Sequence, residues 1–187
     1  MNGYEEFSDY CKLLYKKNLA PGCSGNASIN KGGFVAITPS GVSMNDITTK
    51  NIVEVDFDGN VIGNGKASSE TLMHCLIYKN RSDVKAIIHT HSPFLSTLAL
   101  KGIGIKNSPI VELKYLFSDE VPCIKYNPPG SKELAIDVSE ALKTTNAVIM
   151  QNHGAIVVSK SIKEAFYTYE VLEYTAQVFV QEKLLKL

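Results

Sequence analysis

The chain has 187 residues, of which 44% are hydrophobic, so it is long and apolar enough to form a packed core. Its 19 lysines and arginines balance 19 aspartates and glutamates, which gives no electrostatic reason to expect a nucleic acid or an acidic membrane as partner. No secretory signal peptide is recognisable, and no apolar run approaches the roughly 20 residues of a membrane span. We therefore expect a single soluble, cytoplasmic domain over residues 1–187.

The cysteines are far apart in the sequence and form no CxxC pair. This spacing, in a chain without a signal peptide, argues against a disulfide framework. We expect reduced thiols, most of them buried, at Cys11, Cys23, Cys75 and Cys123.

The first part of the chain predicts one helix followed by two β-hairpins. Apolar side chains recur at helical spacing over residues 4–18. The glycine-rich stretch PGCSGN then leads into a hairpin over residues 27–38, which turns at Gly32 and Gly33. The turn TPSG follows, and residues 51–65 form a second hairpin around the turn DGN.

The rest of the chain predicts helices that alternate with short strands. The helices are expected over residues 68–80, 93–102, 131–145 and 161–187, and the strands over residues 84–89, 123–126, 146–150 and 155–159. Because hairpins join some strands and helices join others, we expect a mixed or mostly antiparallel sheet with helices packed on it. Neither nucleotide-binding fingerprint, GxGxxG or GxxxxGK[ST], is present.

Three histidines lie where apolar strands end. His89 and His91 occur in AIIHTHSPF, and residues i and i+2 of a strand share a face, roughly 6.5–7 Å apart. His153 occurs in VIMQNHGAIVV, where an apolar strand meets a glycine turn. Each histidine taken alone also fits a hydrogen-bonded structural residue.

Together, the three histidines favour a metal site. Burying three imidazoles is costly unless each gains a partner, and a metal ion supplies one. Three neutral imidazoles with an open fourth position are typical of catalytic zinc, although cobalt, iron and manganese accept the same ligands.

Three polar stretches could bind an anion. GCSGNAS offers backbone N–H groups and small side chains at Gly25 and Asn26, and KASSET places Ser68 and Ser69 at a helix start, where the dipole favours a phosphate. TPSG, residues 38–41, adds a third set. Each stretch alone also fits an ordinary turn or helix cap.

Glu70 follows the serine pair in the first turn of a predicted helix. It fits a glutamate that complements the helix dipole, but also a base that takes a proton from carbon next to a carbonyl. A metal that binds this carbonyl would stabilise the resulting enediolate. His74, four residues later on the same helix, is interpreted as a structural or helix-surface residue.

The segments GCSGNASI, ITPSG, ASSETLMH, IIHTHS and QNHGAIV, in this order over residues 22–157, resemble the class II aldolase/adducin family. The resemblance implies a three-layer αβα domain around a mostly antiparallel sheet, and a homotetramer with active sites at subunit interfaces. It also implies one zinc ion per subunit on His89, His91 and His153. Glu70 would be the acid/base, and Tyr115 would reach a neighbouring subunit's site as a proton donor. The implied phosphate-binding residues are Gly25, Asn26, Ser40, Gly41, Ser68 and Ser69.

The resemblance further implies reversible cleavage of a ketose 1-phosphate, such as L-fuculose 1-phosphate, to dihydroxyacetone phosphate and an aldehyde. The alternatives are a methylthioribulose-1-phosphate-type dehydratase, a ribulose-phosphate 4-epimerase and a non-enzymatic adducin-like scaffold. Glu70 argues against the epimerases, which tend to have aspartate there, and the intact metal ligands argue against a scaffold. A Schiff-base aldolase would need a buried lysine, whereas most lysines here lie in polar patterns. Pro128 and Pro129 replace a family aromatic residue that contacts the aldehyde half of the substrate.

Overall fold

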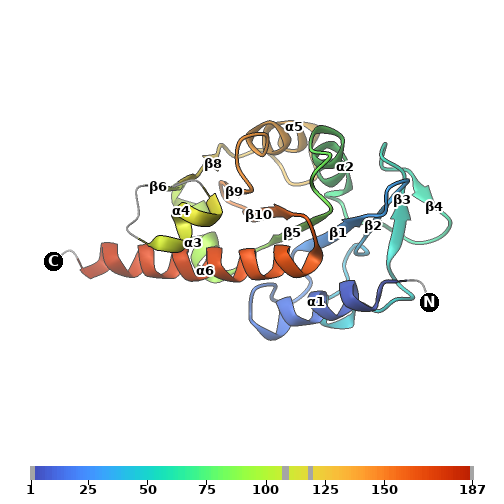
Figure 1. The fold of residues 1–187 in the computed structure, drawn as a ribbon, viewed down its shortest axis with the longest axis horizontal. Coiled ribbons are helices and arrows are strands. Elements are labelled where there is room, and N and C mark those ends of the chain that lie inside the picture. The colour runs from blue at the N-terminus through green and yellow to red at the C-terminus, as the bar shows by residue number, and fades with distance from the viewer. Residues whose placement is uncertain (1–2, 107–109, 118–119, 186–187) are drawn as a thin grey trace.

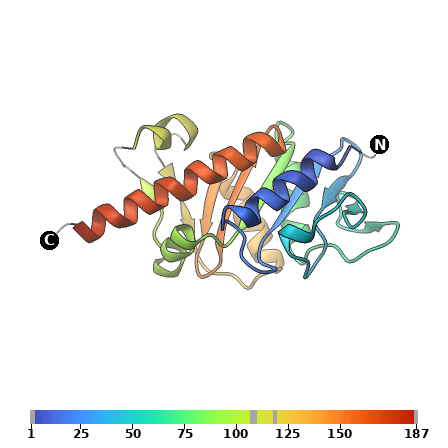
Figure 2. The same ribbon diagram turned by 90° about the horizontal axis from the view of Figure 1, so that it is seen from below.

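The computed structural model of the protein describes residues 3–106, 110–117 and 120–185. It has three layers, with helices on both faces of a central sheet (Figures 1 and 2). The expected αβα architecture is therefore confirmed. Within the described ranges, no helix combines the length and the apolar character that a membrane crossing requires.

The central sheet has eight strands, and all neighbouring pairs are antiparallel except β8 with β9. In spatial order the strands are β4 (Val61–Ile62), β3 (Val53–Val55), β2 (Val35–Ile37), β1 (Asn26–Asn30), β5 (Ala86–Thr90), β10 (Gly154–Ser159), β9 (Ala147–Met150) and β8 (Cys123–Ile124). A separate antiparallel pair consists of β6 (Ile105–Lys106) and β7 (Glu120–Val121).

The helices divide between the two faces of the sheet (Figures 1 and 2). One face carries α1 (Glu5–Lys16), α3 (Pro93–Lys101) and α6 (Ile162–Leu185). The opposite face carries α2 (Thr71–Asn80) and α5 (Lys132–Ala141). The short α4 (Val111–Phe117) packs against α6, and the 3-10 helix η1 (Met44–Asp46) packs against α1.

Strand β5 lies in the middle of the sheet and is buried on both faces. Ile87 packs into the core beneath α2 and α5, and Ile88 packs into the core beneath α1, α3 and α6. A strand covered on both faces can be apolar at successive positions, which explains the run Ala86-Ile87-Ile88 before the first histidine.

Some element boundaries differ from the expected ones. Helix α2 begins at Thr71 rather than at residue 68, so Ser68 and Ser69 lie in the loop before it. Helix α5 begins after Ser131, whose hydroxyl accepts a hydrogen bond from the Leu134 N–H at 3.1 Å, as expected for an N-cap. Elements β6, α4 and β7 lie in a segment for which the sequence pattern predicted no element.

All four cysteines are free thiols in the structure. Cys11 and Cys75 are buried, Cys123 is partly buried and Cys23 is exposed. The expectation of reduced, mostly buried thiols fits this arrangement except at Cys23.

Candidate active site

One pocket of about 380 Å³ brings together the residues predicted to bind metal and phosphate. Its wall contains the three histidines, Glu70 and all six predicted phosphate-binding residues, which are Gly25, Asn26, Ser40, Gly41, Ser68 and Ser69. The remaining lining residues are Cys23, Ser24, Pro39, Pro129 and Asn152. Segments from residue 23 to residue 153 therefore converge on one place.

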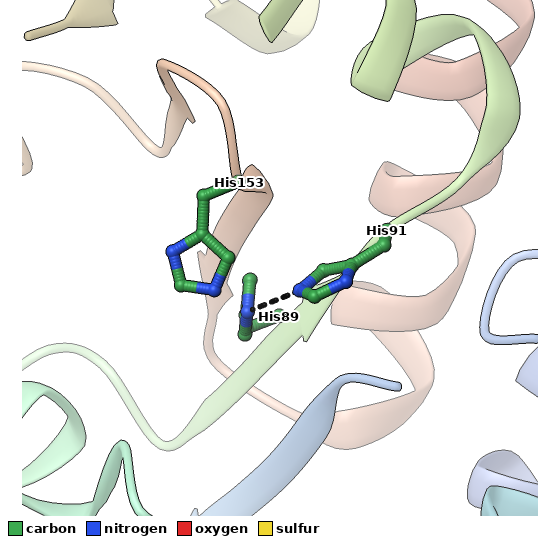
Figure 3. Close-up of side chains that lie close together, drawn as sticks. All are labelled: His89, His91 and His153. Atoms are coloured by element: carbon green, nitrogen blue, oxygen red, sulfur yellow. Dashed lines mark hydrogen bonds between the residues drawn. The ribbon is translucent and has the colours of Figure 1, made fainter. Parts of the chain in front are cut away.

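The three histidine rings face a common point (Figure 3). His89 and His91 project from the end of β5, and His153 lies in the turn between β9 and β10. This turn reaches the end of β5 because β10 pairs with β5, with Ala155 opposite Thr90. One nitrogen from each ring lies within 4.8 Å of the other two, and His89 Nε2 is 3.2 Å from His91 Nε2.

The protonation of the cluster suits metal binding. The carbonyl oxygen of Ala155 accepts a hydrogen bond from His89 Nδ1 at 2.9 Å, which leaves the lone pair of Nε2 directed at the cluster. Burial lowers the pKa of His89 well below its usual value, lowers that of His91, and lowers that of His153 to about 4. All three rings are therefore neutral near pH 7, as metal ligation requires.

The spacing of the rings fits a tetrahedral divalent metal. Metal–nitrogen bonds of 2.0–2.1 Å place two ligand nitrogens about 3.3 Å apart, close to the separation of the His89 and His91 Nε2 atoms. Within the described chain, the buried Nδ1 of His153 has no hydrogen-bond partner. The spacing of the three ring nitrogens therefore fits a bound metal.

A close approach at Gly154 holds the cluster together. A Cβ atom there would lie 2.5 Å from the carbonyl oxygen of Thr90 and 2.8 Å from Cδ2 of the His91 ring. Both distances are far below ordinary contact, so only glycine lets the His153 turn approach the end of β5 this closely.

A second close approach joins the first anion-binding stretch to the metal ligands. Gly25 has φ +77°, and a Cβ atom there would lie 2.6 Å from the carbonyl oxygen of His89. The next residue, Asn26, begins β1 and pairs directly with His89. Directly opposed residues share a face of the sheet, so the asparagine and the histidine line the same wall.

The other two anion-binding stretches are joined by main-chain hydrogen bonds. The N–H of Ser40 donates to the carbonyl of Lys66 at 2.9 Å, and the N–H of Ser68 donates to the carbonyl of Thr38 at 3.2 Å. This bridge holds Ser40 and Gly41 beside the serine pair that precedes α2. The loops 38–41 and 66–69 therefore form one continuous wall of small polar groups.

Glu70 is the carboxylate of this pocket, and it is only 4% exposed. Burial raises its pKa above the usual value, and a hydrogen bond from the Gly130 backbone partly opposes the shift. Gly130 belongs to the loop before α5, and a Cβ atom there would lie 3.3 Å from the carbonyl oxygen of Ser69. A buried carboxylate of raised pKa is suited to proton transfer.

The structure does not bring Tyr115 to this pocket. It lies on α4 with 81% of its surface exposed and is absent from the pocket lining within the described chain. Its catalytic role stays a prediction.

His74 is fully buried and hydrogen-bonded to Ser28 and Asn26, which confirms a structural residue and makes the helix-surface alternative wrong.

Asn152 lines the pocket but was not among the residues predicted from the sequence. It lies next to His153 with φ +59°, a left-handed conformation that asparagine adopts more readily than most residues. The available signal was an asparagine directly before the His-Gly pair in a tight turn.

The family model for the class II aldolase and adducin N-terminal domain matches residues 5–180. An L-fuculose phosphate aldolase of Methanococcus maripaludis is 36% identical, and the match covers 92% of this chain and 93% of the relative. A 5-deoxy-D-ribulose 1-phosphate aldolase of Bacillus thuringiensis is 37% identical, over 96% of this chain and 84% of the relative. A solved L-fuculose 1-phosphate aldolase structure superposes with a TM-score of 0.91 at 32% identity, covering 98% of this chain and 87% of that one.

Proposed function

The chain belongs to the class II aldolase and adducin family, and from this premise we propose that it cleaves a ketose 1-phosphate reversibly to dihydroxyacetone phosphate and an aldehyde. The observation that carries the proposal is the single pocket that holds three neutral imidazoles, a buried carboxylate and three stretches rich in N–H and hydroxyl groups. These are the parts that carbanion chemistry on a phosphorylated ketose needs.

The loops of the pocket would bind the phosphate. Gly25 and Gly41 offer backbone N–H groups, and the serines at 40, 68 and 69 offer hydroxyls, the last two beside the start of α2. These donors lie on the same pocket as the metal ligands, so a substrate bound at its phosphate would extend toward the histidines. The phosphate would therefore orient the ketose.

His89, His91 and His153 would hold a divalent cation, which we take to be zinc because three imidazoles and an open position suit it. The bound cation would supply a Lewis acid for the oxygens of the ketose and for the negative charge that develops there. The tautomer of His89 is set by Ala155, which keeps its ligating nitrogen free of a proton.

Glu70 would move the proton at carbon 3 of dihydroxyacetone phosphate. In the cleavage direction, the bond between carbons 3 and 4 breaks and Glu70 returns a proton to carbon 3; in the condensation direction it removes that proton. The raised pKa of the buried carboxyl brings its proton affinity closer to that of a working acid and base near neutral pH.

Tyr115 would reach the active site of a neighbouring subunit. There it would donate a proton to the aldehyde oxygen in condensation and take that proton back in cleavage. Its exposure on α4 leaves the phenol free to reach another chain, and a homotetramer with active sites at subunit interfaces would provide that neighbour. We assign the enzyme to the cytoplasm as part of this proposal.

The first test uses the half-reaction that needs no aldehyde, which is proton exchange at carbon 3 of dihydroxyacetone phosphate. The zinc-loaded protein is mixed with dihydroxyacetone phosphate in D₂O without an aldehyde, and NMR follows the loss of one carbon 3 proton. We expect stereospecific exchange that stops when a chelator removes the metal. Glu70→Gln should slow the exchange by about 10²–10⁴-fold. Glu133→Gln, an exposed glutamate outside the pocket, is the matched control.

Each of three outcomes would favour a different function. Exchange would leave only the aldehyde to identify, and lactaldehyde and acetaldehyde would separate a fuculose-type from a deoxyribulose-type substrate. Absence of exchange with metal bound would contradict the aldolase and favour a dehydratase or epimerase on the same pocket. A protein that binds no divalent ion would favour the scaffold.

A further inference from the structure

A buried chain of hydrogen bonds reaches the pocket from beneath α2. The hydroxyl of Tyr78 lies 2.8 Å from Ser28 Oγ, which lies 2.7 Å from His74 Nδ1. On the other side of the ring, His74 Nε2 lies 2.7 Å from Oδ1 of Asn26. All four residues are buried, but only Asn26 also lines the pocket.

The chain of hydrogen bonds is attached to two side chains of α2 and to two side chains of β1. His74 and Tyr78 are four residues apart and share a face of α2, whereas Asn26 and Ser28 are two residues apart and share a face of β1. The ring of His74 is therefore held between two side chains of one strand. Such an arrangement orients a ring and its partners better than one hydrogen bond to a free side chain does.

The number of available protons allows only two directions of donation along these hydrogen bonds. Burial lowers the pKa of His74 to about 3, so the ring is neutral and has one N–H. Since an amide oxygen only accepts, Oδ1 of Asn26 requires the proton on Nε2, and Nδ1 then accepts from the hydroxyl of Ser28. Tyr78 completes this direction by donating to Ser28 Oγ or to its carbonyl oxygen, 3.0 Å away.

The reverse direction would place the proton on Nδ1 and turn the amide of Asn26. Its NH₂ group would then donate to the ring, and its carbonyl oxygen would face the pocket. The two directions thus present opposite groups to a ligand: an N–H donor attracts a phosphate, and a carbonyl oxygen repels it.

We propose that His74 is a positioning residue for the substrate phosphate, because it holds the Asn26 amide oxygen and so directs the amide N–H groups into the pocket. The inference rests on the proposed function, in which the loop around Asn26 binds a phosphate. His74 itself does not line the pocket and acts only through Asn26.

The tautomer of His74 gives a direct test on the unmodified protein. Two-dimensional ¹H–¹⁵N NMR of the imidazole rings distinguishes a protonated nitrogen from a bare one. We expect His74 to carry its proton on Nε2 and to have a bare Nδ1. A proton on Nδ1 would overturn the proposal, because the amide would then be reversed.

Binding of inorganic phosphate gives the second test, by calorimetry on the zinc-loaded protein. His74→Leu removes the donor, and we expect phosphate affinity to fall about tenfold, as for the loss of one hydrogen bond to a charged group. His74→Gln should recover part of this loss, because its amide can also donate to Asn26. Cys75→Ala, a buried change at the next position of α2, should bind phosphate as the unmodified protein does.

The outcomes separate this proposal from the proposed function. His74→Leu that folds, binds zinc and keeps full phosphate affinity would overturn the positioning role. The tautomer measurement decides the question if His74→Leu does not fold. A weakened phosphate site with the expected tautomer in a protein that never exchanges the carbon 3 proton would support the positioning role and contradict the aldolase. In an active aldolase, His74→Gln and His74→Leu should raise KM for dihydroxyacetone phosphate while kcat stays close to that of the unmodified enzyme.

Discussion

Replacing Gly154 by alanine tests whether the turn before β10 holds the metal ligands in place. The new Cβ atom would lie 2.5 Å from the Thr90 carbonyl oxygen and 2.8 Å from the His91 ring, where ordinary contact starts at 3.4 Å. The two contacts are therefore too short by about 0.9 Å and 0.6 Å. Because the first neighbour is backbone, we expect the His91 ring and the His153 turn to move apart.

These overlaps set the expected size of the effects on stability and on zinc affinity. Overpacking in a well-packed region destabilises a protein by about 1–3 kcal/mol. Functional groups need to stay within about 0.5 Å of their productive positions, and disturbed support of metal ligands typically lowers metal affinity by about 10–100-fold. We expect Gly154→Ala to lower zinc affinity by this factor in addition to its effect on stability.

The assay is a zinc titration against a chromophoric chelator, together with urea unfolding of the metal-free protein. Gly33→Ala is the matched control, because a Cβ atom at Gly33 meets nothing within 4 Å. If Gly154→Ala bound zinc within twofold of the unmodified protein, the close approach would not be what holds His91 for the metal. Such a result would exclude this role for Gly154, whatever the effect on stability.

Buried polar groups at Glu70, Glu173 and His74 should each respond measurably to a change of pH or of side chain. Because a base works as the carboxylate and burial raises the pKa of Glu70, deuterium exchange should decline on acidification at a pH above the usual glutamate range; a decline no higher than that range would contradict the assignment. Glu173 accepts hydrogen bonds from Ser92 Oγ and from the Phe94 and Leu95 N–H groups at the start of α3, so Glu173→Ala should lower the free energy of unfolding by about 2–3 kcal/mol in urea, and Glu173→Gln by less. His74 binds a proton near pH 6.5 when unfolded but only near pH 3 when folded, so it makes the metal-free protein less stable as pH falls through this window, by at most about 1.4 kcal/mol per pH unit. His74→Gln should therefore show a shallower pH dependence of stability, and equal slopes would count against a buried neutral imidazole.

Local patterns identified the parts of the site. The strand period of two put His89 and His91 on one face, and the structure places both rings at the end of β5 with their Nε2 atoms 3.2 Å apart. Likewise, a helix was expected from residue 131, and α5 begins directly after Ser131, which caps it. Such features depend on neighbours within a few residues, so the sequence contains all the information they need.

The segment between α3 and β8 contains the elements that local sequence patterns did not predict. Its elements β6 and β7 have two residues each and form a separate pair, so neither is long enough to show a recognisable alternation. Tyr115 lies in α4 of this segment, and its assignment came from family resemblance alone. Its surroundings in this chain are solvent rather than the pocket.

Sequence patterns identify the family, the order of most elements and the residue types of the site, because periodicity, caps and motifs are properties of nearby residues. Which of these residues meet depends on the folded chain. His153 reaches His89 because β10 pairs with β5, and Gly25 and Gly154 are required because two backbones approach each other there. The sequence indicated no partner for His74, whereas in the structure its buried ring is hydrogen-bonded to Asn26. Such contacts join residues about 50 or more positions apart, and they follow from sheet register and packing, which sequence spacing does not encode.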